Sequence, residues 1–149
     1  MDVLDPAGLS ERLRSAGLRV TRPRREVYRA LADLGGHRAA DDVYERVVAS
    51  GVRLSRTSVY NALDALEAAG VVLLADAGPG RRLFEVGTTW HHHAVCRQCG
   101  RISDIACAVG EKPCLEPDDP EWGDIEEAQI IFRGVCASCR EQQRRVRKM

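Results

Sequence analysis

Long apolar runs are absent from this sequence of 149 residues. No stretch approaches the roughly 18 consecutive apolar residues of a membrane span, and the N-terminus lacks the basic-then-apolar pattern of a signal peptide. The composition therefore predicts a protein of the cytoplasm with no membrane partner. Apolar residues still make up 44% of the chain, which is enough for a real core in one domain or two small ones.

The chain also lacks a net charge, because 22 Lys and Arg residues balance 22 Asp and Glu residues. Residues 12–29 nevertheless contain seven arginines and a single acid, Glu26. Nucleic acids respond to the local field rather than to the total charge, so this segment is compatible with a basic DNA-binding face. On charge alone, a solvated arginine-rich surface explains the segment as well.

The first half of the sequence has the order of elements of a winged helix-turn-helix. Apolar periodicity, Pro23 in a first helical turn and Gly70 as a C-cap predict four helices. Two β-rich segments follow, joined by the turn-rich residues 76–80. The predicted helices cover residues 7–16, 22–34, 39–50 and 55–70, and the predicted strands cover residues 71–75 and 82–86.

The second half of the sequence has a different pattern of predicted secondary structure. Strand-like segments at 92–96, 101–106 and 128–133 are separated by cysteine pairs and by an acidic stretch rich in Gly and Pro. The polar C-terminal segment predicts a short helix or a frayed tail. The sequence thus predicts an α+β fold with one domain at residues 1–87 and a β-rich domain at 88–149.

The fourth predicted helix could read a DNA major groove. Its apolar stripe fixes one face inward, so the polar residues near the other face are available to bases. Arginine pairs with guanine, asparagine pairs with adenine, and a tyrosine ring packs against thymine methyl groups. Arg19, Arg22 and Arg24 flank the start of the second helix, where they suit phosphate or minor-groove contacts. The predicted base-reading residues are Arg56, Ser58, Tyr60 and Asn61.

Four of the six cysteines form two C-x-x-C pairs, Cys96 with Cys99 and Cys136 with Cys139. In a reducing compartment such thiolates serve metals or redox chemistry rather than a disulfide framework. Two such pairs supply the four ligands of a tetrahedral structural zinc. A thioredoxin-like redox pair is the alternative, but neither pair opens a helix after a buried strand.

The run of three histidines next to the first cysteine pair predicts a second, separate metal site. On a β-strand, side chains alternate between faces, so His91 and His93 point one way while His92 and Cys96 point the other. A tight turn after Cys96 would pair His93 with Asp104. His92 is the histidine of the triplet to which we assign no ligand role.

The predicted second site combines His91, His93 and Asp104 with Glu85, which ends the wing, and His37, the only other histidine. Three imidazoles and two carboxylates suit Fe(II), Mn(II) or Zn(II) rather than a soft metal. A metal held there would span both domains and fix their relative orientation.

Together these residues resemble the ferric uptake regulator (Fur) family over nearly the whole chain. The resemblance is carried by G-L-R-V-T-R-P-R, S-V-Y-N-A-L, W-H-H-H-A-V-C-R-Q-C-G and the final C-A-S-C. It implies a homodimeric repressor that binds a double-stranded DNA operator, with a winged-helix DNA-binding domain (1–87) and a metal-binding dimerisation domain (88–149). It also implies a structural zinc and a regulatory metal at the five residues named above. In the PerR-like arrangement the first carboxylate is usually Asp, so Glu85 is a departure.

The segment D-I-A-C-A-V-G-E-K-P-C-L, with its extra Cys107 and Cys114, resembles the peroxide-responsive FurA/CatR branch, which is PerR-like. That resemblance implies oxidative-stress control of catalase-peroxidase genes. Two sensing routes stay open: oxidation of an Fe(II) ligand, His37 or His91, or a disulfide between Cys107 and Cys114. Inert packing of the two cysteines is the plain alternative.

Other functions compete with this interpretation. Within the class, the alternative is an iron- or zinc-uptake regulator without redox sensing. A zinc or thiol enzyme would need zinc with an open position and a nearby base, whereas four thiolates close the first site. The sequence therefore predicts no catalytic residue and no small-molecule substrate. A zinc-ribbon interaction module would not need the arginine cluster.

Overall fold

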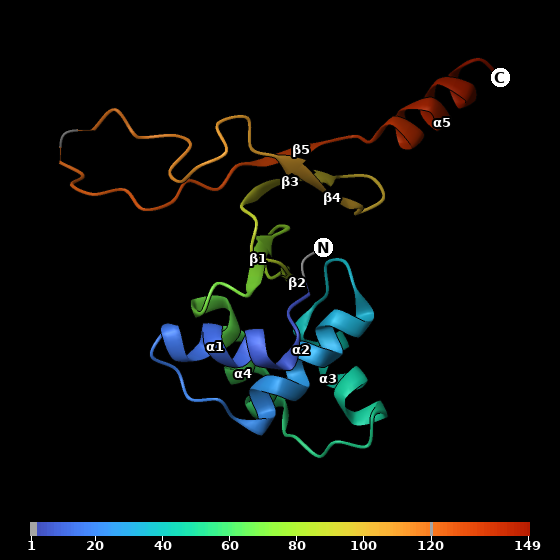
Figure 1. Ribbon diagram of the computed structural model, residues 1–149. Helices are drawn as coiled ribbons and strands as arrows, with labels where there is room; N and C mark the ends of the chain where they lie inside the picture. Colours follow the sequence, from blue (N-terminus) through green and yellow to red (C-terminus); the bar gives the residue numbers. More distant parts are fainter. Residues whose placement is uncertain (1–2, 120) are drawn as a thin grey trace. The chain divides into compact units, whose positions relative to one another are not determined.

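A computed structural model describes residues 3–119 and 121–149. The chain divides into two compact units, Met1–Thr88 and Thr89–Met149. Figure 1 shows the helical first unit with its hairpin and the β-rich second unit. Among the described residues, every helix is too short or too polar to traverse a lipid bilayer.

The first unit confirms the predicted winged helix. Its elements are α1 (Pro6–Ser15), α2 (Arg22–Leu34), α3 (Ala40–Ala49), α4 (Arg56–Ala68), β1 (Val72–Asp76) and β2 (Arg82–Val86). Local chemistry sets the ends of the helices. The Thr21 hydroxyl accepts a hydrogen bond from the Arg24 N–H at 3.5 Å, and the Ser55 hydroxyl accepts one from the Ser58 N–H at 3.1 Å. Gly35, with φ of 63°, ends α2 in a conformation that a side chain would strain.

The apolar faces of these helices meet in one core. Val27 and Leu31 of α2, Val43 of α3, and Val59 and Leu63 of α4 are each 0% exposed. A fully buried aliphatic side chain of this kind contributes about 1.5–3 kcal/mol. The core orients α4 so that its polar face points to solvent.

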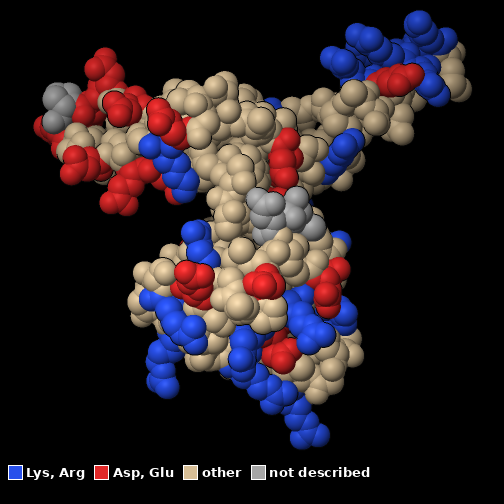
Figure 2. Space-filling view, in the orientation of Figure 1, with Lys and Arg blue, Asp and Glu red and all other residues tan. Residues whose placement is uncertain are grey.

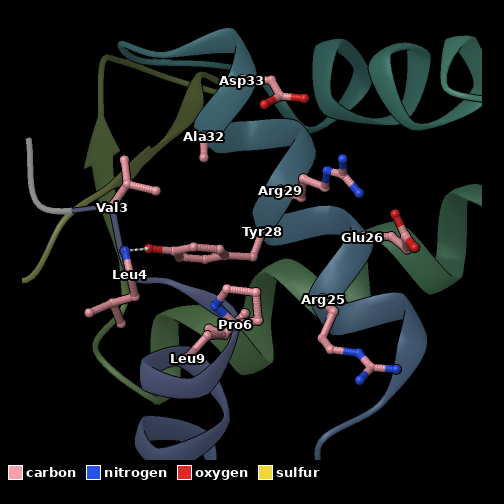
Figure 3. Close-up of a pocket in the computed structure, with 10 residues that line it drawn as sticks. All are labelled: Val3, Leu4, Pro6, Leu9, Arg25, Glu26, Tyr28, Arg29, Ala32 and Asp33. Atoms are coloured by element: carbon pink, nitrogen blue, oxygen red, sulfur yellow. Dashed lines mark hydrogen bonds between the residues drawn. The ribbon is translucent and has the colours of Figure 1, made fainter.

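The N-terminal segment is held against α2 through Tyr28. The Tyr28 hydroxyl accepts a hydrogen bond from the Leu4 N–H at 2.9 Å, as Figure 3 shows. Burial raises the pKa of this phenol. The same residues line a cavity of about 580 Å³ that is open to solvent and bordered by Arg25 and Arg29.

The hairpin of the first unit gains a third partner from the loop between α2 and α3. Strand β1 pairs antiparallel with β2, which places Leu73 opposite Glu85. Arg38 forms an isolated antiparallel bridge to Phe84, with hydrogen bonds of 2.8 and 2.7 Å. This bridge brings the loop residue His37 beside β2.

The second unit is built on a three-stranded sheet with β3 (His91–Cys96) at its centre. Strand β4 (Ile102–Ala106) pairs with β3 antiparallel, and β5 (Ile131–Gly134) pairs with β3 in parallel. The third strand is thus shorter than the predicted 128–133. The C-terminal segment forms a helix, α5 (Ala137–Arg147), with three arginines in its last turn, where they complement the helix dipole.

Candidate functional site

The two cysteine pairs come together in the second unit. The sulfurs of Cys96, Cys99, Cys136 and Cys139 all lie within 4.8 Å of one another. The Sγ atoms of Cys99 and Cys136 are 3.8 Å apart. Two thiolates at about 2.3 Å from a tetrahedral zinc are separated by about 3.8 Å, so this group fits that ion.

Electrostatics within this four-cysteine cluster also favour a bound cation. Backbone N–H groups of Cys99 and Cys136 lower the pKa of Cys96 to about 6. The side chain of Cys136 and burial raise the pKa of Cys139 to about 12. Four thiolates this close repel one another, so they ionise together only around a positive ion.

On the opposite face of β3, two histidines and a carboxylate converge. The Nε2 atoms of His91 and His93 are 3.1 Å apart, and Asp104 Oδ1 lies 3.1 Å from His91 Nε2 and 3.7 Å from His93 Nε2. Cross-strand pairing places Asp104 directly opposite His93, the register predicted from the turn. His91 Nδ1 donates to the Thr89 carbonyl at 2.9 Å, which leaves the Nε2 lone pair for a metal.

The first unit supplies the other two predicted ligands as a pair. His37 Nε2 lies 2.9 Å from Glu85 Oε2, and their side chains are 9% and 10% exposed. The bridge between Arg38 and Phe84 positions both, because each residue is adjacent in sequence to a bridge partner. Nitrogen and carboxylate oxygen donors in both units suit Fe(II), Mn(II) or Zn(II).

A third cluster joins the two remaining cysteines to His92. Cys114 Sγ lies 3.3 Å from His92 Nε2, and the ligand atoms of His92, Cys107 and Cys114 are all within 4.8 Å of one another. The Gly110 N–H donates to Cys107 Sγ and lowers the pKa of that thiol, whereas burial raises the pKa of Cys114. Strand alternation correctly separated His92 from its neighbours but could not reveal its partner, because the partner lies in an irregular loop.

On α4, the predicted base-reading residues differ in what they contact. Arg56, Tyr60 and Asn61 are exposed, whereas Ser58 is half-buried and its hydroxyl accepts from Ser55 at 2.9 Å. Asp41 of α3 accepts hydrogen bonds from both the Arg56 guanidinium and the Tyr60 hydroxyl. The acceptor on α3 was not predicted, since no local pattern links residues 15 or 19 positions apart.

The three arginines predicted to contact DNA lie near the start of α2 but differ in exposure. Arg19 and Arg22 are exposed, and Arg24 is half-buried with its guanidinium donating to the Arg19 carbonyl. Figure 2 shows basic side chains projecting from the helical unit, with acidic residues between them. In the wing, Arg82 lies 3.3 Å from Asp64, so both ends of the reading face carry ion pairs.

Comparisons with known proteins agree with this arrangement. The profile of the "Ferric uptake regulator family" matches residues 15–114. The transcriptional regulator FurA of Mycobacterium tuberculosis is 41% identical over 132 residues, covering 87% of this chain and 88% of FurA. The peroxide-responsive repressor PerR of Staphylococcus epidermidis is 28% identical over 131 residues, covering 87% of each chain.

A solved structure has the same architecture. The ferric uptake regulator from Pseudomonas aeruginosa, determined with manganese, superposes with a TM-score of 0.68 at 28% identity, covering 86% of this chain and 97% of that one. These relatives are transcriptional regulators and not enzymes. With its winged helix, its clustered cysteines and a family profile that spans most of its length, the chain belongs to the ferric uptake regulator family.

Proposed function

We propose that this protein is a homodimeric repressor that binds a double-stranded DNA operator when a regulatory metal is present, and that releases the operator in response to peroxide. The observation that carries the proposal is the placement of nitrogen and oxygen ligands in both units. His37 and Glu85 pair in the first unit, while His91, His93 and Asp104 converge in the second.

We infer that these five residues hold one regulatory ion, Fe(II), Mn(II) or Zn(II). An ion bound by ligands from both units restricts how the two units orient, and thereby sets the spacing of the two α4 helices of a dimer. Dimers of this kind read two half-sites whose separation matches that of their reading helices. The four-cysteine cluster holds a structural zinc in this proposal.

The surface that would contact DNA is the exposed face of α4 together with the start of α2. Arg56, Tyr60 and Asn61 project from α4 and can reach base edges, while Arg19 and Arg22 are exposed for phosphates. Ser58 contributes through the backbone of the helix cap, because its hydroxyl is engaged with Ser55.

In this proposal peroxide is sensed by one of two routes, and release of the operator then controls catalase-peroxidase-type genes, as the resemblance to the FurA/CatR branch implies. When Fe(II) is bound, it supplies the reduction of peroxide, with His37 or His91 as the residue oxidised. Alternatively, peroxide takes two electrons and the two thiol protons from Cys107 and Cys114, which form a disulfide while the peroxide is reduced to two waters. Their sulfurs lie within 4.8 Å of each other, and the lowered pKa of Cys107 makes it the more reactive thiol.

The first test compares Asp104→Asn with Asp124→Asn, a control that removes an exposed carboxylate from the acidic loop. Full-length protein is analysed for metal before and after mild chelation, and its affinity is measured for a duplex selected from a randomised pool with Mn(II). The expected result is one tight zinc per chain in both variants, with loss of the exchangeable Mn(II) and of Mn(II)-dependent DNA binding in Asp104→Asn alone. Wild-type behaviour of Asp104→Asn would refute the proposed regulatory site.

The second test separates the sensing routes by mass spectrometry after peroxide treatment of the Fe(II)-loaded protein. One added oxygen on a peptide containing His37 or His91 identifies the iron route. Loss of two hydrogens across Cys107 and Cys114 identifies the disulfide. If peroxide leaves DNA binding unchanged, the protein is a metal-uptake regulator without redox sensing.

A further inference from the structure

We propose that His92, Cys107 and Cys114 form a third metal-binding site, which takes Zn²⁺ and lies entirely within the second unit. It shares no ligand with the four-cysteine cluster or with the histidine and carboxylate groups described above. Two thiolates and one imidazole are ligands that bind Zn²⁺ in preference to Fe(II) or Mn(II).

The separations of the ligand atoms match such a site. Cys114 Sγ and His92 Nε2 are 3.3 Å apart, and all three ligand atoms lie within 4.8 Å of one another. In tetrahedral zinc, with Zn–S near 2.3 Å and Zn–N near 2.05 Å, sulfur and nitrogen are about 3.6 Å apart and two sulfurs about 3.8 Å apart. Small shifts of the side chains therefore bring the three atoms to bonding distance of one ion.

The surroundings hold the imidazole in place for this role. His92 is 4% exposed, and its ring meets the Trp90 ring edge to face, with centroids 5.7 Å apart and planes at 84°. The Ile130 N–H donates to His92 Nδ1 at 3.3 Å, and Nε2 on the far side of the ring lies 3.3 Å from Cys114 Sγ. A buried histidine on the central strand is thus aimed at the two thiols rather than at solvent.

The loop between β4 and β5 positions the cysteines. Gly110, with φ of 82°, turns the chain back between them, and its N–H donates to Cys107 Sγ at 3.4 Å. Cys114 lies beside His92 of β3, and its thiol donates to the Ala128 carbonyl at 3.7 Å. Residues that are seven positions apart on the loop thereby reach one histidine of β3.

Loading the site has a defined proton balance. Zn²⁺ replaces one proton on each of the two thiols and forms two Zn–S bonds, so two protons are released for each ion. Binding at His92 Nε2 requires the ring proton to reside on Nδ1, and the long Ile130 hydrogen bond to that atom is then lost. Three protein ligands leave the fourth zinc position for water.

One consequence rests on the proposed redox function. A disulfide and a zinc ion both need the sulfurs of Cys107 and Cys114, so they exclude each other. Zinc in this site would protect the pair from peroxide, and the disulfide route would operate only in its absence. The metal site itself does not depend on that function.

The test uses full-length, reduced protein that retains its structural zinc, titrated with Co²⁺ as a spectroscopic substitute for Zn²⁺. A thiolate-to-cobalt absorption band should grow until one equivalent of cobalt is bound at the third site. Cobalt bound at the histidine and carboxylate site adds no such band, because that site has no sulfur ligand. Cys114→Ser and His92→Ala should lose that band, and His37→Ala should keep it. Failure of the regulatory site would leave the band unchanged, so the two proposals are tested separately.

A second measurement covers variants that fold poorly. In the unmodified chain, zinc beyond the structural ion should slow alkylation of both Cys107 and Cys114 at least tenfold, and a mild chelator should restore the rate. Unchanged alkylation rates, or a cobalt titration that shows no thiolate band, would overturn the third site.

Discussion

Removal of the proposed structural zinc should unfold the second unit and leave the first folded. The first unit has a continuous apolar core around α2 and α4. Among the described residues of the second unit, only Val95, Cys96 and Cys139 are buried apolar residues, and two of these belong to the four-cysteine cluster. The second unit thus has little apolar burial of its own to replace the metal.

The magnitudes favour the metal strongly. A fully buried valine contributes about 1.5–3 kcal/mol, whereas a structural zinc site contributes on the order of 10 kcal/mol or more to folding. Cys99→Ser is the best perturbation, because Cys99 is exposed and its replacement removes a ligand without opening a cavity. The loss of stability expected from this variant is therefore that caused by the missing zinc, with no added cost from a cavity.

Hydrogen exchange measured by mass spectrometry reports the folding of each unit separately. In Cys99→Ser, amides of β3 should exchange within the fastest time points, while those of α2 and α4 keep their protection. Cys107→Ser, a substitution outside the four-cysteine cluster, is the control and should retain the zinc and the protection of β3. If zinc-free Cys99→Ser protected β3 as the unmodified chain does, the reasoning from core size would be wrong.

Three further predictions concern single side chains. Leu63→Ala should destabilise the first unit by about 2–5 kcal/mol, measured by urea unfolding, because Leu63 is 0% exposed in the core. Asp41→Asn should tighten DNA binding up to about fivefold, because it frees Arg56 from a surface ion pair worth up to about 1 kcal/mol. Fluorescence anisotropy measures this change, and weaker binding would count against contact between Arg56 and DNA. Cys107 should be alkylated faster than Cys114 near pH 7.5. The lowered pKa of Cys107 gives more thiolate at that pH, and the raised pKa of Cys114 gives less. Equal alkylation rates of the two thiols across a pH series would contradict this order.

Local patterns in the sequence predicted most of the first unit. Thr21 caps α2 and Ser55 caps α4, and such caps can be specified locally, because a capping hydroxyl acts on a backbone N–H only three residues away. The apolar spacing of Val59 and Leu63 likewise determined the buried face of α4. Such features need no knowledge of the rest of the chain.

Local sequence features also predicted how β3 pairs with its antiparallel partner, β4. Alternation separated His91 and His93 from Cys96, and the tight turn set His93 opposite Asp104. A short hairpin leaves few possible registers, so the sequence alone brought these ligands together. His37 and Glu85 were grouped because one is the only other histidine and the other ends the wing, and the bridge beside them supplies the physical basis of their pairing in the first unit.

Only the tertiary structure decided the contacts that cross long, irregular connections. Strand β5 joins β3 in parallel after a loop of more than twenty residues, and no local signal fixes the register of such a pairing. That loop brings Cys114 to His92, and the packing of α3 against α4 brings Asp41 to Arg56. The sequence by itself determined the helices, the strands and the face of each on which these side chains lie. Their contact partners depended on how distant segments pack, because the closure of a long loop is set by the whole fold and not by the residues next to it in sequence.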